Sequence, residues 1–107
     1  SKPKVDNLSS WAGTIIPQSG GWYTSSWFGS FKTTSREWIY HTEMQWLYPA
    51  PMKDGSIWLW NQKDGWRWTQ EDVFPYLFRW RDFTWIYLYG RKDGELLFYN
   101  YSTQSYE

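Results

Sequence analysis

Residues 38–48 of the chain read WIYHTEMQWLY, and residues 58–68 read WLWNQKDGWRW. The two stretches match position for position, so that an aromatic residue at 38, 40, 46 or 48 has an aromatic partner 20 residues later. Each triplet alternates an aromatic residue with a different side chain, which is the two-residue period of a strand and not the period of a helix. This pattern predicts two antiparallel hairpins, over residues 37–48 and 56–69.

The turns and a third unit extend this pattern. Asp-Gly pairs at 54–55, 64–65 and 93–94 supply the positive φ that tight turns require. A third hairpin is expected over residues 83–101, with Trp85-Ile86-Tyr87 paired to Leu96–Tyr101. Phe74-Pro75-Tyr76 is expected to interrupt any strand within Glu71–Trp80, and a weaker opening unit lies in residues 22–31.

Composition gives the fold class. The 107 residues include 11 Trp, 9 Tyr and 6 Phe, and such aromatic residues favour pleated sheets. A helix is expected only as one short turn near Thr69–Asp72, with Thr69 as its cap. We therefore predict an all-β chain, an antiparallel meander of three to four aromatic-rich hairpins that forms a curled sheet or a small repeat array.

Turn-forming residues dominate the first 21 positions, so residues 1–21 are expected to be a leader or linker and residues 22–107 the aromatic-rich hairpin module. Only five side chains of this leader could anchor it to a core: Val5, Leu8, Trp11, Ile15 and Ile16.

Strand alternation predicts two faces, both rich in apolar side chains. The aromatic face carries Trp38, Tyr40, Trp46, Tyr48, Trp58, Trp60, Trp66, Trp68, Trp85, Tyr87, Tyr89, Tyr99 and Tyr101. The opposite face carries Ile39, Leu47, Ile57, Leu59, Ile86, Leu88, Leu96 and Phe98, with His41, Arg67, Thr69 and Asn100 among them. An ordinary half-exposed sheet alternates apolar with polar residues, so each of these faces needs a cover.

Several function classes are disfavoured. Eleven basic and eleven acidic residues give a net charge of zero, which argues against nucleic acid as the partner. No apolar run approaches the length of a membrane span. With no cysteine and one histidine, His41, the usual zinc sites and nucleophile–base pairs cannot be assembled, and His41 is expected to be structural. We expect no catalytic residue, metal or cofactor, and thus no enzyme.

Two interpretations remain for the aromatic face. In the first, the rings stay partly open as a platform for sugars, whose C–H faces stack on rings while hydroxyls meet Tyr O–H and Trp N–H groups. In the second, the rings pack on each other edge to face and no ligand is needed. The candidate ligand-binding residues are Trp38, Tyr40, Trp46, Tyr48, Trp58, Trp60, Trp66, Trp68, Trp85 and Tyr87.

Within this set, Trp60, Trp66 and Trp68 flank the Asp64-Gly65 turn, where burial is hardest, and are expected to be platform rings. Three arginines, Arg67, Arg79 and Arg81, are interleaved with aromatic residues. They are expected either to be solvated and to shield exposed rings, or to contact an anionic glycan through their guanidinium groups.

The hairpin pattern over residues 37–69 loosely resembles the choline- and glucan-binding cell-wall repeats. A closer resemblance, over residues 21–107, is to a tryptophan-rich module of secreted or surface proteins of marine bacteria. Segments such as Ser26-Trp27-Phe28-Gly29, Ser56-Ile57-Trp58-Leu59-Trp60 and Phe98-Tyr99-Asn100-Tyr101-Ser102 carry it. The chain departs from that module at Met44-Gln45, where His-Gly is usual. The resemblance implies an extracellular setting and assigns no activity.

The sequence thus predicts a non-catalytic extracellular or cell-surface binding module, part of a larger secreted protein, whose ligand is a polysaccharide or cell-wall glycan. The alternative is a structural or protein-interaction domain, whose aromatic face packs on itself, on a neighbouring domain or on another copy of the chain.

Overall fold

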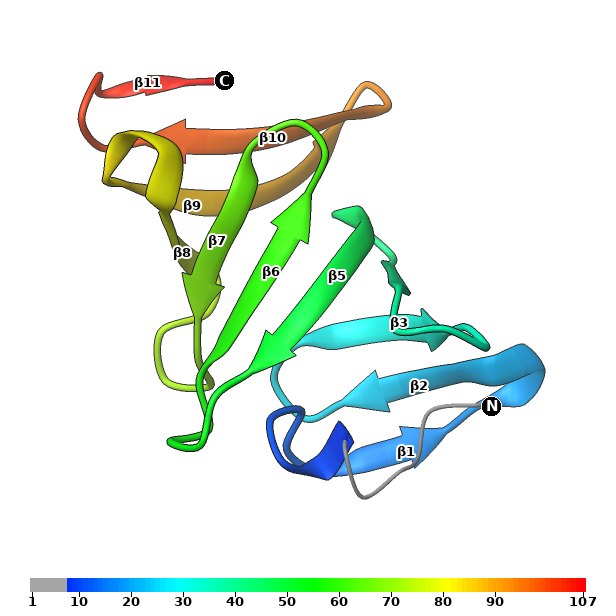
Figure 1. Cartoon of the computed structure of the whole chain (residues 1–107). Helices are drawn as coiled ribbons and strands as arrows, with labels where there is room; N and C mark the ends of the chain where they lie inside the picture. Colours follow the sequence, from blue (N-terminus) through cyan, green and yellow to red (C-terminus); the bar gives the residue numbers. More distant parts are fainter. Residues whose placement is uncertain (1–7) are drawn as a thin grey trace.

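The computed structural model describes residues 8–107, which form one antiparallel sheet of eleven strands in a simple meander (Figure 1). The strands are β1 (Ile15–Pro17), β2 (Trp22–Ser25), β3 (Gly29–Thr33), β4 (Ile39–His41), β5 (Gln45–Pro51), β6 (Ile57–Asn61), β7 (Gly65–Thr69), β8 (Tyr76–Arg79), β9 (Thr84–Lys92), β10 (Glu95–Asn100) and β11 (Ser105–Tyr106). Two single-turn 3-10 helices, η1 (Ser19–Gly21) and η2 (Trp80–Asp82), lie between strands. The predicted all-β meander is confirmed.

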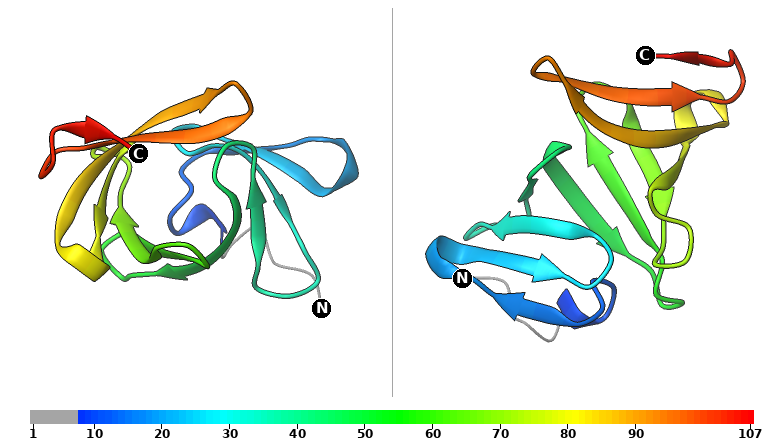
Figure 2. Two further views of the ribbon diagram at one scale, coloured as in Figure 1. Left: turned by 90° about the horizontal axis from the view of Figure 1, so that it is seen from above. Right: turned by 180° about the vertical axis from the view of Figure 1, so that it is seen from behind.

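The sheet curls around its own core without closing into a barrel. Seen along the curl, β5 to β10 form an arc with β1 to β4 to one side of it (Figure 2). One face of every central strand is therefore enclosed and the other faces outward.

The enclosed face is the aliphatic one, as alternation predicted. Ile57, Leu59 and Ile86 are fully buried, as is Leu47 on β5. The remaining buried apolar side chains are Leu8, Trp11, Ala12, Phe28, Phe31, Ile39, Met44, Leu77, Leu88 and Phe98. The period-two pattern thus placed the core correctly.

The predicted hairpins are present with small shifts of their ends. Tyr40 pairs with Trp46, and Trp60 pairs with Trp66, so the two 20-residue units have the same register. The third hairpin is β9–β10, in which Tyr87 pairs with Tyr99. The meander is longer than the three to four hairpins expected, because further strands lie before, between and after these units.

One added strand lies where the sequence predicted an interruption. Residues 71–75 do form a turn, but Tyr76–Arg79 is strand β8 and pairs on both sides, Phe78 with Trp68 and with Trp85. The short helix expected near Thr69–Asp72 is absent. Thr69 ends strand β7, and its hydroxyl donates to the carbonyl of Tyr76 at 2.8 Å instead of capping a helix.

Residues 8–21 pack on the module. Ile16 in β1 pairs with Thr24 in β2, and Leu8 and Trp11 are buried among Phe28 and Phe31. Two of the five expected anchors therefore enter the core and Ile15 packs against it, whereas Ile16 is exposed and Val5 lies outside the described residues. The folded unit continues back past residue 21, the expected end of the leader.

A five-residue turn recurs between successive strands, at residues 25–29, 41–45, 61–65, 79–83 and 100–104. Its fifth residue has a positive φ in every case: Gly29 (94°), Gln45 (67°), Gly65 (74°), Phe83 (53°) and Gln104 (57°). In four of the turns the first side chain, that of Ser25, His41, Asn61 or Asn100, accepts the backbone N–H groups of the third and fourth residues. These bonds satisfy donors that the turn would otherwise leave unpaired.

His41 is the only member of this set that titrates near neutral pH. Its Nδ1 accepts the N–H groups of Glu43 and Met44 at 3.1 and 3.2 Å, so the ring proton lies on Nε2, which donates to the carbonyl of Phe28 at 2.7 Å. Burial lowers the pKa of His41 below its ordinary value of 6.5, against the opposing effects of the Phe28 carbonyl and the charge of Glu43. The structural role predicted for His41 agrees with these contacts.

We expect the unfolding free energy to fall as the pH drops below about 6.5, by at most about 1.4 kcal/mol per pH unit. The unfolded chain binds a proton at its ordinary pKa, whereas the folded His41 resists it until a lower pH. In His41→Asn, the turn keeps an acceptor like that of Asn61 and Asn100, and stability should be flat over this range. Urea midpoints at pH 7.5, 6.0 and 5.0 measure how stability changes with pH in the parent and in His41→Asn. Equal slopes in the two proteins would show that His41 does not control this dependence.

Candidate functional site

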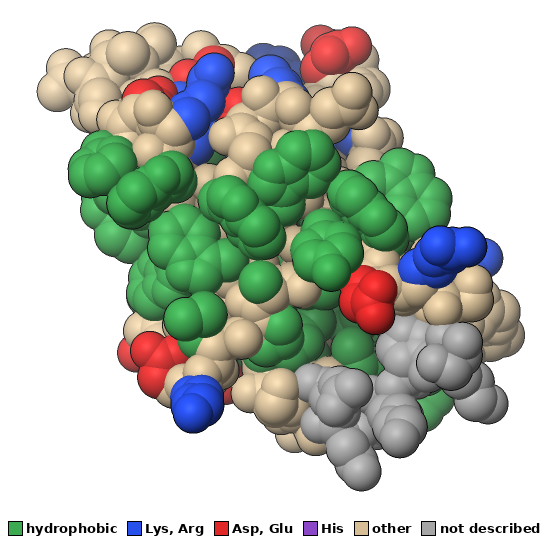
Figure 3. Space-filling model, viewed as in Figure 1, with side chains coloured by type: hydrophobic (Ala, Val, Ile, Leu, Met, Phe, Trp, Pro, Cys, Tyr) green, Lys and Arg blue, Asp and Glu red, His purple; other side chains and the backbone are tan. Residues whose placement is uncertain are grey.

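All ten candidate ligand-binding residues lie on the outer face of the sheet. Three are exposed, namely Trp46, Trp66 and Trp85, and the other seven are half-buried. Figure 3 shows hydrophobic side chains gathered in a band across the face formed by β5, β6 and β7, with charged groups at its margins. This band is the largest gathering of hydrophobic side chains in that view and is therefore the surface on which a binding site is sought.

Neighbouring rings of the outer face pack edge to face. Trp38 meets Tyr48 with ring centroids 5.5 Å apart and Trp60 at 5.9 Å, both nearly perpendicular. Similar contacts join Tyr40 to Trp46 and Trp68 to Trp85. Such pairs each contribute about 0.5–1.5 kcal/mol beyond burial. The rings thus support one another while part of their surface stays open.

An apolar groove of about 330 Å³ opens on this face, lined by Ala50, Trp58, Trp66 and Trp80. Ala50 on β5 lies opposite Trp58 on β6, and its small side chain leaves the space that a larger residue would fill. The rings of Trp58 and Trp80 stand at 84° with centroids 6.1 Å apart, so they form two walls. Trp66 on β7 is a third wall.

The groove contains only part of the predicted site. Trp58 and Trp66 were candidates and line it, whereas Trp60 and Trp68, expected as platform rings, are half-buried and do not. Trp80 and Ala50 were not candidates. A signal for Trp80 was present, because this large apolar residue lies between two arginines. Ala50 gave none, because the flanking prolines Pro49 and Pro51 concealed the continuation of β5.

The turn between β8 and β9 is the most apolar of the five turns on its exposed side. Trp80 is 54% exposed and Phe83 is 65% exposed, and their ring centroids lie 4.7 Å apart. Phe83 also meets Phe78 on β8 at 5.8 Å. The turn therefore extends the aromatic surface from the groove toward the end of the sheet.

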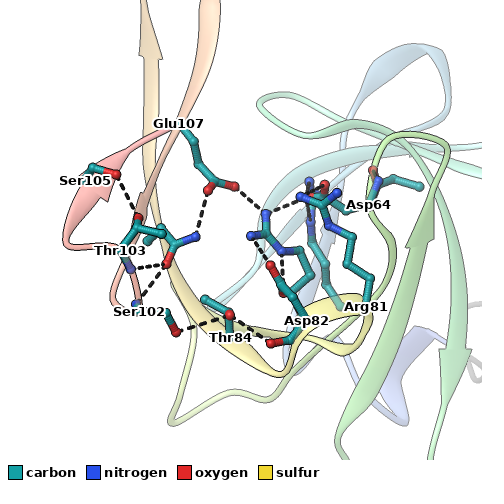
Figure 4. A network of polar contacts seen from close by, with 12 residues as sticks. Asp64, Arg81, Asp82, Thr84, Ser102, Thr103, Ser105 and Glu107 are labelled. Carbon is teal, nitrogen blue, oxygen red and sulfur yellow. Dashed lines mark hydrogen bonds and ion pairs between the residues drawn. The ribbon is translucent and has the colours of Figure 1, made fainter.

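A buried ionic network lies behind this turn, on the inner side of the sheet (Figure 4). Arg67 donates to Asp64 Oδ2 from Nη2 at 2.7 Å and from Nε at 3.2 Å. Arg79 grips both oxygens of Asp82, from Nε at 3.0 Å and from Nη2 at 2.9 Å, and its Nη1 contacts Asp64 and Glu107. The Arg67 guanidinium also lies 4.5 Å from the centre of the Phe98 ring. These pairs hold the β6–β7 and β8–β9 turns together.

The network also sets the ionisation of its carboxyl groups. Burial alone would raise the pKa of Asp64, but the hydrogen bond from Arg67 and the charges of Arg67, Arg79 and Arg81 outweigh it and lower the pKa. Hydrogen bonds from Arg79 lower the pKa of both Asp82 and Glu107. Their contribution to stability is present at neutral pH and is lost as the pH falls through these lowered values.

The expectation that the arginines shield exposed rings is wrong for Arg67 and Arg79, which are buried in ion pairs. Strand parity had placed Arg67 on the inner face, and its carboxylate partner makes that placement tolerable. Arg81 is about half exposed. It makes an ion pair with Asp64 Oδ1 at 3.5 Å and, among the described residues, no hydrogen bond.

Two other features are absent from residues 8–107. These residues contain no group of three or more His, Asp or Glu side chains placed to hold a metal ion. They also contain no helix of the length and apolar character that crossing a bilayer requires.

Comparison of the chain with protein-family models, with curated proteins and with solved structures finds no match. The resemblance to a tryptophan-rich module therefore stays a prediction, and the groove with its surrounding rings is the observation from which a function must be argued.

Proposed function

We propose that this chain is a non-catalytic binding module of a secreted or cell-surface protein, and that it binds a polysaccharide through the aromatic outer face. The groove formed by Ala50, Trp58, Trp66 and Trp80 is the observation that carries this proposal. Its volume lies at the small end of the range for small-molecule sites, which suits one part of a chain-like ligand better than an enclosed ligand.

The walls of the groove match the apolar faces of a sugar ring. The C–H faces of a sugar are apolar and gain from contact with exposed indole rings. Its hydroxyls need polar partners, and the indole N–H groups of Trp58, Trp66 and Trp80 donate to no protein acceptor within residues 8–107. Three rings on a supported sheet therefore suit the apolar faces of a glycan.

The alternative is an interaction domain whose aromatic face packs on a neighbouring domain or on another copy. The observation that favours it is the spread of exposed rings beyond the groove, including Trp46, Tyr89 and Tyr106. In that case the free chain should self-associate as its concentration rises. Sedimentation from 1 to about 100 μM, a range that spans typical weak interfaces, distinguishes the two functions.

Changes to the groove should weaken glycan binding without unfolding the chain. We expect Trp66→Ala, which removes one wall, to weaken binding about tenfold or more. Ala50→Leu should do the same by filling the groove while keeping every ring. Trp46→Ala is the matched control, because Trp46 is 53% exposed on the same face but does not line the groove.

A glycan array read by tryptophan fluorescence would select the polysaccharide, and calorimetric titration would measure the affinity of each variant. Thermal melting confirms that the variants are folded. Affinity lost equally in Trp46→Ala, or retained in Ala50→Leu, would exclude the groove as the site. Failure of the folded chain to bind any glycan, with self-association instead, would favour the interaction domain.

A further inference from the structure

Phe83 is the one bulky residue at the fifth position of the recurring turn. The fifth residue of the recurring turn is Gly29, Gln45, Gly65 or Gln104 elsewhere, whereas Phe83 adopts a φ of 53° with a bulky ring. A left-handed backbone is uncommon for a bulky residue and costs free energy. Burial does not compensate for it, since the ring is 65% exposed. Strain retained at an exposed position is a pointer to function.

The surrounding structure holds this turn firmly. Arg79 takes the first position, where the other turns have an acceptor, and it binds both carboxylate oxygens of Asp82 within the turn. Arg79 is itself buried and is also tied to Asp64 and Glu107. The rings of Trp80 and Phe83 are therefore presented by a rigid support, as a binding surface requires.

The ring pair is continuous with the groove. Trp80 contacts Trp58 in the wall of the groove, and its ring centroid also lies 4.7 Å from that of Phe83. A polysaccharide residue seated in the groove would have its neighbour in the chain beside this pair. The groove has room for only a short part of a polymer, so the next sugar residue of the chain would lie outside it, on the Trp80–Phe83 ring pair.

Arg81 belongs to the same turn and carries a positive charge. Its guanidinium reaches Asp64 in the neighbouring turn, and Asp64 and Arg81 stand close in sequence to the groove residues Trp66 and Trp80. The guanidinium groups of Arg67 and Arg79 make short hydrogen bonds with carboxylates. Arg81, in contrast, makes only its 3.5 Å ion pair within the described residues, and about half of its side chain is exposed. Its free donors match the geometry of a carboxylate or a sulfate ester.

We propose that the turn of residues 80–83 is a second subsite, which binds an acidic sugar residue adjacent to the one in the groove. Phe83 and Trp80 contact the ring of that sugar, and Arg81 binds its carboxylate or sulfate. This inference rests on the proposed glycan-binding function and narrows the ligand to an acidic polysaccharide.

Replacing Phe83 by glycine gives the sharpest test, because the turns that end at Gly29 and Gly65 show that the backbone accepts glycine at this position. Binding of hexagalacturonate, a linear uronic-acid probe, should weaken about fivefold to tenfold. The melting temperature should stay within about 3 °C of the parent or rise, because relief of strain offsets the lost ring contacts. Phe83→Gln, which introduces the residue found at Gln45 and Gln104, is a second variant with the same expectation.

Arg81→Gln tests the charge. It should weaken hexagalacturonate binding about tenfold and leave binding of cellohexaose, a neutral probe, within about twofold of the parent. Lys63→Gln is the matched control, since Lys63 is an exposed cation in the adjacent β6–β7 turn. It should change neither affinity.

The outcomes separate the subsite from the groove. If Trp66→Ala and Ala50→Leu weaken hexagalacturonate binding but the Phe83 and Arg81 variants do not, the subsite is wrong and the groove stands. If Phe83→Gly melts more than about 8 °C lower, the ring is structural and the subsite is also wrong. If the parent chain binds neither hexagalacturonate nor cellohexaose, the glycan-binding groove and the acidic subsite are both wrong for these two ligands.

Discussion

Replacing Trp11 by alanine should destabilise the chain by about 3–5 kcal/mol, which is a large share of the stability of a domain of this size. Trp11 is 4% exposed and its ring packs against Trp27, Phe28 and Phe31. Its carbonyl also accepts the indole N–H of Trp27 at 2.9 Å. The alanine variant would keep this carbonyl but lose the ring contacts, and it would leave a cavity at the start of the curled sheet. Urea unfolding followed by fluorescence measures the change.

Trp46→Ala is the matched control and should cost about 1 kcal/mol or less, because the ring is exposed and its removal opens no cavity. Trp11 belongs to the segment that sequence composition assigned to a leader, so the comparison also tests where the folded unit begins. An equal effect in the two variants, or a negligible effect of Trp11→Ala, would mean that residues 8–21 contribute little to the fold.

The central strands could be predicted from sequence because one physical pattern dominates them. Alternation in Trp38–Tyr40 and Trp58–Trp60 places aromatic rings outward and Ile39 and Leu59 inward, and a one-residue shift would expose the whole core. The 20-residue spacing then fixes the equivalent register of β4–β5 and β6–β7. Local pattern and global packing agree in this region, so the sequence is informative.

The recurring turn could not be recognised from its letters. Its first residue is serine, histidine, asparagine or arginine, and its fifth is glycine, glutamine or phenylalanine. What the first residues share in four of the turns is an acceptor atom within reach of two backbone N–H groups, which is a geometric property. Asp-Gly pairs are a strong turn signal, but in this series only the turn at residues 61–65 contains one.

The site was only partly predictable for a related reason. An Asp-Gly pair explains Asp64 as a turn residue, and this sufficient local explanation concealed its buried ion pairs with Arg67 and Arg79. The groove exists because a small side chain occupies one position between large rings. Ala50 has no signal of its own, and its effect follows only from its pairing with Trp58 across two strands.

Replacing Asp64 by asparagine should destabilise the chain by about 3–5 kcal/mol, as expected when one partner of a buried ion pair is removed. The change conserves shape but removes the carboxylate that accepts two bonds from Arg67, and Arg67 is 2% exposed with no other carboxylate at bonding distance in the described residues. The buried guanidinium charge would then be uncompensated. Asp54→Asn is the matched control, at another Asp-Gly turn, because the Asp54 side chain is exposed and, within residues 8–107, bonds only to Ser56. It should have a much smaller effect on the urea midpoint.

The double variant Asp64→Asn with Arg67→Met separates the penalty for an unpaired charge from the value of the pair itself. Methionine is a long apolar side chain that replaces the guanidinium over Phe98, and it removes the charge that Asp64→Asn leaves without a partner. We expect the double variant to recover at least about 1 kcal/mol relative to Asp64→Asn, because residues in one network are strongly non-additive. A double variant as unstable as the sum of the two single changes would show that Asp64 and Arg67 act independently. The stability of the two turns would then depend mainly on Arg79, whose contacts with Asp82 and Glu107 both variants retain.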